Sequence, residues 1–419
     1  MKLKLDAFAD CVAEIAARGQ VSQEGARAIL QEVADRAEQL RRQGRENAAQ
    51  AAAEEIGTAA REAAQRSKLD LYRNAQKRVA VMNEIRSNGG IQNAVETLRS
   101  MLHSTYRTSL DSVQGVSRGI RDSIIAPLNA KLKAEGLLKP LISGQMDEDV
   151  AKELWRLNNK GLGEASNNAA ALKAASLLKP ALDMVRDRLN SAGANIGEAL
   201  DWVAHTRHDP GKMRRAAGAL KSTDEAFQAW WDFTKPLLGP KTWNDLRIAE
   251  GETETEAQAR FARSVFDAKI SGVHFTANGS RDVREPSPYM PPVYEGTRNI
   301  AKKLGEERVL FFRDGASWNS YMQRFGAQSS LLHGVAMSVE QGARNIALME
   351  RFGTNPAEGL NRVLQAVEGE YRSDLDAVSK FRNKAQGVKN VMGFLDGTNN
   401  LPVNRDAAAI ASSVRTVES

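Results

Sequence analysis

Residues 308–356 contain the pattern that most constrains the fold, because aromatic and chain-breaking residues follow one another there at helical spacing. The segment begins with a β-prone run, RVLFF, which stops at Asp314 and Gly315. Asp314 is a favourable N-cap residue and predicts a short helix that Gly326 terminates. One face of this helix would carry three aromatic side chains, at Trp318, Tyr321 and Phe325.

A longer helix is predicted next, because apolar residues recur at steps of three and four. These residues are Leu332, Val335, Val339, Ala343, Ile346 and Met349. Gly353 and then Pro356 supply the stop signal. The pattern therefore predicts two consecutive helices, and each conspicuous residue in them has an ordinary packing or capping role.

The N-terminal part of the chain has a different composition. Residues 22–86 are rich in alanine, glutamate, arginine and glutamine, and no proline occurs before Pro127. This composition predicts long helices, which Gly44 and Gly57 would loosen. The alanine-dominated residues 48–64 can pack only closely and weakly, so such a helix is marginal on its own. We therefore expect partners for it, in a bundle, a coiled coil or a homo-oligomer.

Prolines and glycines punctuate the remaining sequence. They predict breaks near Pro127 and Gly136 and a turn near Pro180, and SRDVREPSPYMPPVYEG is the longest irregular stretch. We predict an all-α fold: an elongated multi-helix bundle with long N-terminal helices and at most a short β element near residues 308–312. The predicted divisions are an N-terminal helical hairpin or coiled region (1–88), a helical bundle (89–200), a helical domain (201–285), a proline-rich hinge or arm (286–300) and a C-terminal helical segment with the aromatic motif (301–419).

The formal net charge of +6 and the pI near 9.3 suggest nucleic acid or an acidic membrane surface as a partner. However, acidic residues are interleaved with basic ones, and the basic excesses at residues 107–139 and 298–313 lack the density of a nucleic-acid-binding arm. Solvated helix faces are therefore the favoured interpretation, and contact with DNA or acidic lipid is the alternative.

Membrane insertion by a single helix is not indicated by the sequence. No run approaches the roughly 18 consecutive apolar residues that a membrane span needs. Asp6, Asp10 and Glu14 argue against an N-terminal signal peptide. A membrane role would therefore require several amphipathic helices that assemble around a pore.

Few residues suggest metal or nucleic-acid chemistry. The single cysteine, Cys11, excludes an intramolecular disulfide framework and is expected on the apolar side of the first helix. His205 and His208 lie three residues apart near a predicted helix end, and no further ligands follow at defined spacing, so capping or packing is favoured over metal binding. Core packing is likewise favoured over base stacking for three tryptophans near prolines: Trp230, Trp231 and Trp243.

Catalytic motifs are also missing from the sequence. No P-loop, HExxH, GxSxG or CxxC pattern occurs. Pairs of Asp and Glu are abundant, so a lysozyme-like site with two carboxylates is an alternative, but no Glu has a distinctive aromatic or glycine setting. We therefore predict no catalytic, cofactor-binding or metal-binding residues, and a protein that is not an enzyme.

The segment at residues 308–356 resembles one found in internal virion (ejection) proteins and large polyvalent proteins of tailed bacteriophages. Weaker similarity in VAHTRHDPGKMRRAAG, VFDAKISGVHF and LPVNRDAAAIASSVR extends the resemblance over roughly residues 200–415. None of the residues that carry it is catalytic by inheritance. They are Arg308, Phe312, Asp314, Trp318, Tyr321, Phe325, Gly326, Ala343, Arg344, Ile346, Met349, Gly353 and Pro356.

The resemblance implies a structural component of a tailed-phage virion. Such a protein is packaged in the capsid interior near the portal, is released with or before the genome, and assembles a conduit across the host envelope or periplasm. The implied partners are further copies of the chain, other internal or ejection proteins, portal or tail proteins, phage DNA through non-specific contact, and the host envelope membrane. The alternative is a DNA-binding helical module of a polyvalent protein that coats or escorts incoming DNA. A third candidate is an enzyme with an unrecognised hydrolase site.

Overall fold

The computed structural model describes residues 23–42, 44–103, 111–194, 196, 203, 208–243, 246, 248, 251–271 and 310–396. These residues are almost all helical, and their only β structure is two isolated bridges, so the predicted all-α class is confirmed. One bridge joins Leu238 to Phe312, the last residue of the run RVLFF that the sequence predicts to be β-prone. The predicted first helix with Cys11, the predicted hinge at 286–300, His205 and Arg308 lie outside the described residues.

The chain divides into two compact units. One comprises residues 1–76 with 283–299, and the other comprises residues 77–282 with 300–419. Of the divisions predicted from sequence, 89–200, 201–285 and 301–419 all contribute to the second unit.

The first unit contains a hairpin made by α2 (Gln23–Arg42) and the first part of α3 (Ala48–Ser87). The chain turns between them at Gly44, whose φ of +80° suits glycine. Arg36 and Arg45 both pair with Glu55, which ties the two helices together. Their shared core is small and rich in alanine, as the composition predicts: Val33, Ala37, Leu40, Ala48, Ala49 and Ala52.

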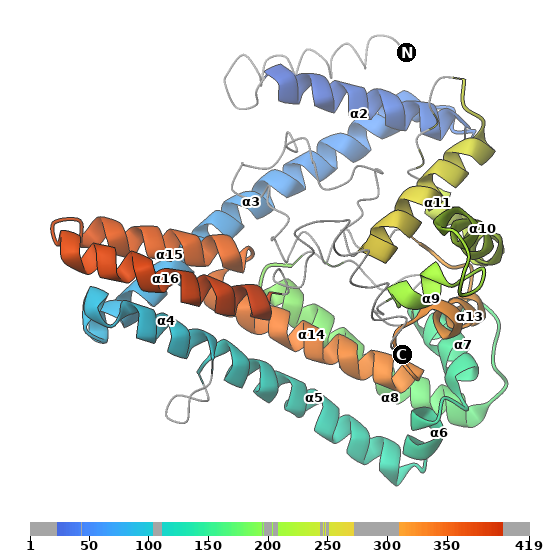
Figure 1. The fold of residues 1–419 in the computed structure, drawn as a ribbon. Coiled ribbons are helices and arrows are strands. Elements are labelled where there is room, and N and C mark those ends of the chain that lie inside the picture. The colour runs from blue at the N-terminus through green and yellow to red at the C-terminus, as the bar shows by residue number, and fades with distance from the viewer. Residues whose placement is uncertain are drawn as a thin grey trace. The chain divides into compact units, whose positions relative to one another are not determined.

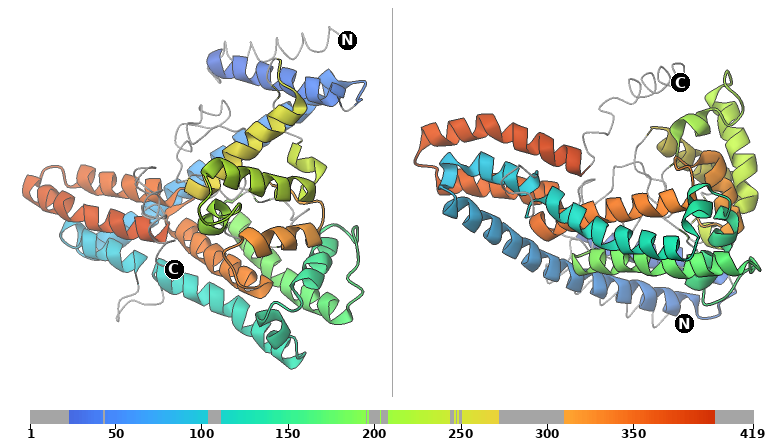
Figure 2. Two further views of the ribbon diagram at one scale, coloured as in Figure 1. Left: turned by 45° about the vertical axis from the view of Figure 1, so that its right-hand side comes forward. Right: turned by 90° about the horizontal axis from the view of Figure 1, so that it is seen from below.

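The second unit is organised around α14 (Leu331–Phe352). It packs against α5 (Val113–Ala134), α6 (Leu138–Ile142), α7 (Asp147–Asn158), α8 (Ala169–Ser191) and α15 (Pro356–Glu370). Figure 2 shows α5, α8 and α14 running side by side. All six residues of the predicted apolar stripe are buried, which confirms the three- and four-residue periodicity.

Further helices cover one end of this arrangement (Figure 1). They are α4 (Ala94–Leu102), the 3₁₀ turn η1 (Gly90–Gln92), α15 and α16 (Leu375–Leu395). The last turns of α3 belong to this unit and are held by two ion pairs, Arg86 with Glu370 at 2.6 Å and Arg351 with Glu84.

The remaining elements of the second unit carry more than half of the aromatic residues that the structure describes there. They are α9 (Pro210–Arg214), α10 (Thr223–Thr234), η2 (Lys235–Leu237), η3 (Pro240–Trp243), α11 (Glu254–Ser271) and α13 (Gly315–Phe325). α13 also packs against α7, which connects these elements to the helices around α14.

The break predicted near Pro127 and the turn predicted near Pro180 were wrong. Pro127 lies inside α5 and Pro180 lies inside α8. Both prolines are exposed, so the carbonyl group that each leaves without an intrahelical donor can face water. The buried stripe continues on either side of each proline, and this packing outweighs the local cost. The break predicted near Gly136 is confirmed, since α5 ends at Ala134.

None of the helices in the described part of the chain is both long enough and apolar enough to cross a membrane.

Candidate functional site

The aromatic helix α13 begins and ends where the sequence predicts. The Asp314 carboxylate caps it by accepting a hydrogen bond of 2.7 Å from the Ser317 amide. Trp318, Tyr321 and Phe325 point into the core and are at most 5% exposed. Of the other predicted motif residues, Phe312, Ile346 and Met349 are also buried.

Tyr321 lies at the centre of an aromatic cluster. Its ring centroid is 5.0 Å from that of Phe312, 5.3 Å from Phe325 and 5.5 Å from His208. Its hydroxyl oxygen accepts a hydrogen bond of 3.2 Å from Nε1 of Trp230, across elements 91 residues apart. Burial raises the pKa of the Tyr321 phenol, so the group stays neutral and acts as a packed hydrogen-bond acceptor.

The three tryptophans extend this cluster, as the preference for core packing predicts. Trp230 stacks on Trp231 and contacts Phe266, and Trp231 meets Trp243 edge to face at 6.1 Å. Trp230 and Trp231 are buried, so their ring faces are unavailable for stacking on bases. Four cationic side chains cover rings at the rim of the cluster: Lys235, Lys241, Arg263 and Arg324.

His208 has the packing role that the sequence favours. Its ring lies edge-on to Tyr321, and its backbone forms an isolated bridge with Gly326. The next residue, Asp209, caps α9 by accepting hydrogen bonds from the amides of Gly211 and Lys212. No group of three or more metal-ligating side chains occurs among the described residues.

The two predicted glycine stops work for different physical reasons. Gly353 adopts φ +90°, a conformation that other residues avoid, and Pro356 then starts α15. Gly326 has an ordinary φ of −77°, but a Cβ atom there would lie 2.4 Å from the carbonyl oxygen of Met322. Close backbone approach, and not a left-handed conformation, therefore requires glycine at this position.

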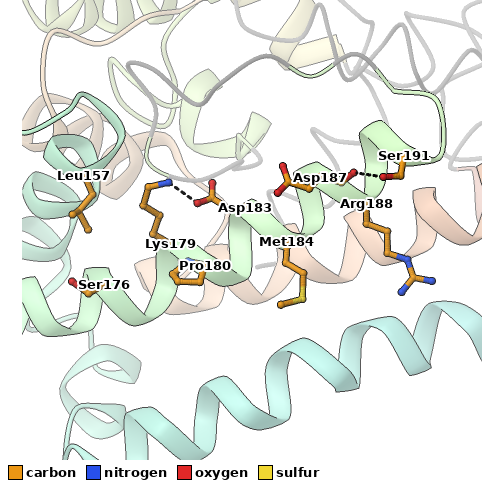
Figure 3. A pocket seen from close by; sticks show the side chains of 9 residues that line it. All are labelled: Leu157, Ser176, Lys179, Pro180, Asp183, Met184, Asp187, Arg188 and Ser191. Carbon is orange, nitrogen blue, oxygen red and sulfur yellow. Dashed lines mark hydrogen bonds and ion pairs between the residues drawn. The ribbon is translucent and has the colours of Figure 1, made fainter.

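A pocket of about 750 Å³ lies along α8 (Figure 3). Lys179 pairs with Asp183 at 2.5 Å, Arg186 pairs with Asp183 and Asp187, and Arg188 pairs with Glu350. Each charged side chain that lines the pocket therefore has an opposite charge beside it. The lining residues contribute no nucleophile activated by a base. They are Leu157, Ser176, Lys179, Pro180, Asp183, Met184, Asp187, Arg188 and Ser191.

Two buried carboxylates on α7 were missed by the sequence reasoning. Asp147 is 6% exposed, and its Oδ2 accepts a hydrogen bond of 2.9 Å from the amide of Leu331, the first residue of α14. Its Oδ1 is buried without a hydrogen-bond partner among the described residues. Burial therefore raises the pKa of Asp147.

Glu153, two turns further along α7, has the opposite electrostatic setting. It is 3% exposed, and burial opposes its ionisation. However, it accepts hydrogen bonds from the amide and hydroxyl of Ser166 at 2.8 and 2.7 Å and pairs with Arg156 at 3.0 Å. These interactions outweigh burial and lower the pKa of Glu153. Charged residues are frequent in α7, as they are in solvent-exposed helices. No pattern in the sequence therefore distinguishes these two buried carboxylates from exposed ones.

Replacing Trp318 by alanine should destabilise the second unit by about 3–5 kcal/mol, because it removes a large buried aromatic side chain. Chemical denaturation followed by circular dichroism checks this expectation. Gln323→Ala, at an exposed position of the same helix, is the control. An unchanged midpoint for the Trp318 variant would contradict its placement in the core.

Asp147→Asn should stabilise the protein increasingly as the pH rises from 3.8, the ordinary pKa of the carboxyl, through the raised pKa of the folded state. The unfolded chain releases this proton first, so ionisation of Asp147 disfavours folding. Asparagine keeps an oxygen that can accept from Leu331 without adding charge. Unfolding midpoints from pH 3.5 to 7, followed by tryptophan fluorescence, measure the gain. An equal gain for Glu148→Gln, which alters the exposed neighbouring carboxylate, would rule out burial as the cause.

Glu153→Gln should show the reverse pH dependence. Because the folded state lowers the pKa of Glu153 below 4.5, its carboxylate stabilises the fold above that pH, and this stabilisation is lost as the pH falls through the lowered value. The substitution should cost roughly 1.5–3 kcal/mol at pH 7, since it weakens hydrogen bonds to a charged group. The same pH series tests it, and a deficit that persists unchanged at the acidic end would contradict the electrostatic explanation.

These residues pack in the core, cap helices or carry buried carboxylate groups. No protein-family model, no curated protein and no solved structure matches the chain.

Proposed function

We propose that the chain is a structural internal virion, or ejection, protein of a tailed bacteriophage. It is released with the genome and assembles with further copies into a conduit across the host cell envelope. The observation that carries the proposal is the resemblance of residues 308–356, a segment whose described part forms α13 and the central helix α14. Several of the described residues that carry the resemblance are buried at the centre of the second unit.

Exposed apolar side chains on α3 support assembly into an oligomer. Leu69 and Tyr72, three residues apart on this helix, are 55% and 63% exposed, and Leu71 between them is 40% exposed. Side chains of this size gain free energy when a partner removes them from water, by about 1.5–3 kcal/mol each when fully buried. In the proposed role the partners are copies of this chain, other internal or ejection proteins, and portal or tail proteins. The proposed location is the capsid interior near the portal, followed by the host envelope or periplasm.

The role proposed is not enzymatic. The motif residues pack, cap helices or terminate them, and the charged side chains of the α8 pocket are paired with one another. Such residues supply a fold that can assemble, not a reaction centre.

The second candidate function is a helical module that coats or escorts incoming DNA. The observation that favours it is a set of exposed lysines on α16, Lys380, Lys384 and Lys389, none of which has an ion-pair partner in the part of the chain that the structure describes. The net charge of +6 is consistent with such a partner.

Light scattering and negative-stain imaging of the purified protein, with and without liposomes, test the conduit. The wild-type protein should form rings or tubes on lipid. Changing Leu69 and Tyr72 together to glutamate should prevent this assembly, because the charges oppose burial of that part of α3. Changing Leu162 and Leu220 to glutamate, at two exposed turn positions, adds the same charge and should leave assembly intact. A wild-type protein that remains compact and ignores lipid contradicts the proposal.

A further inference from the structure

The exposed side chains in the middle of α16, from Ser379 to Asn390, are polar or basic, and two exposed apolar side chains, Leu375 and Phe394, lie at the ends of the helix. Its inner face packs against α4 and α15 and buries Ala377, Val378, Phe381, Ala385, Val388 and Met392. Between residues 377 and 395 the helix contains no acidic residue, but it contains Lys380, Arg382, Lys384 and Lys389. Asp376 in the first turn offsets part of this charge, and the exposed part of the helix keeps a net positive charge.

Because Gly387 of α16 has no side chain, a third cation can lie against this exposed part of the helix. Lys380, Lys384 and Gly387 are spaced four and three residues apart, so they lie on one side of the helix. Arg99 reaches across from α4, and its Nη2 lies 2.7 Å from the position that a Cβ atom of residue 387 would occupy. The Arg99 guanidinium therefore rests against the bare backbone at Gly387. We call Arg99, Lys380 and Lys384 the α4–α16 basic face.

The three cations of this face are exposed and have no ion-pair partner among the described residues. On the far edge of the same helix, by contrast, Arg382 pairs with Glu368 at 2.7 Å. Lys380 and Lys384, one helical turn apart on the same side of α16, repel one another, and a polyanion would relieve that repulsion. Asn383, exposed beside Lys384, adds an amide of the kind that also contacts phosphates.

We propose that the α4–α16 basic face binds the phosphate backbone of duplex DNA without regard to sequence. Lys380 and Lys384 are about 6 Å apart along the helix axis, close to twice the rise of about 3.4 Å per phosphate of one DNA strand. A membrane surface fits less well, because the main apolar face of α16 is already buried against α4 and α15, and the exposed apolar side chains Leu375 and Phe394 lie at opposite ends of the helix and form no continuous stripe. The inference deepens the second candidate function, on which it rests, by naming the residues that make the contact.

Fluorescence anisotropy with a short duplex of arbitrary sequence, titrated at several salt concentrations, tests the proposal. Replacing Lys380 and Lys384 by alanine should weaken binding and make the slope of log affinity against log salt shallower by about 2, since each phosphate contact contributes about 0.9. Replacing Lys131 and Lys133 of α5 by alanine removes the same charge from another exposed site and should leave the slope unchanged within error.

Gly387→Ala supplies a second, independent variant. The new methyl group would displace the Arg99 guanidinium, so DNA affinity should fall, and the salt slope should become shallower by about 1. The melting temperature should not fall, because alanine favours the helix and a flexible side chain can move aside. Arg99→Ala should match Gly387→Ala in DNA affinity.

The outcomes distinguish a failure of the proposed binding site from a failure of the DNA-escort function. If the wild-type protein does not bind DNA, both the basic face and the DNA-escort candidate are overturned. If it binds but the α5 variant loses as much as the α16 variant, only the basic face is overturned. Vesicles of phosphatidylcholine with phosphatidylglycerol give the last comparison. If the α16 variant loses vesicle binding but keeps its DNA affinity, the face is a lipid contact and the proposal fails.

Discussion

Helices α5, α6, α7, α8 and α15 all pack against α14, and the second unit depends on that burial. The apolar stripe of α14 is enclosed by these neighbours, so its residues have little room to move or change size. The ends of the helix are held by polar contacts as well. Asp147 accepts from the first amide of α14, and Glu350 and Arg351 near its last turn pair with Arg188 and Glu84. One helix thereby joins segments that are far apart in the sequence.

Many of the described aromatic residues lie on α10, η3, α11 and α13, and most of their rings contact one another. Tyr321 and Trp230 share a buried hydrogen bond, which fixes the register between α13 and α10 in a way that apolar packing alone would not. The motif residues of α13 and α14 that the structure describes therefore build a core or bound helices. In the structural role proposed above, contacts with partners would be made by other residues, on the surface of the protein.

Some exposed cationic side chains have a carboxylate partner, whereas others have none among the described residues. Most exposed arginines near helix junctions have carboxylate partners, as in Arg86 with Glu370 and Arg382 with Glu368. The α4–α16 basic face lacks such partners among the described residues. Paired charges on a surface contribute little to stability, whereas an unpaired cluster creates a field that attracts polyanions. The two candidate functions thus use different surfaces, one apolar on α3 and one basic on α16.

The sequence alone determined the helical class, the cap at Asp314, the stops at Gly353 and Pro356, and the buried stripe of α14. Each of these depends on neighbours within a few residues, so local propensity and periodicity were sufficient. The tertiary structure alone decided the rest. Pro127 and Pro180 stay inside helices because packing on both sides of them outweighs the local cost. Asp147 meets Leu331, 184 residues away, and Arg99 covers Gly387, because folding brings distant segments together, and no local pattern encodes such contacts.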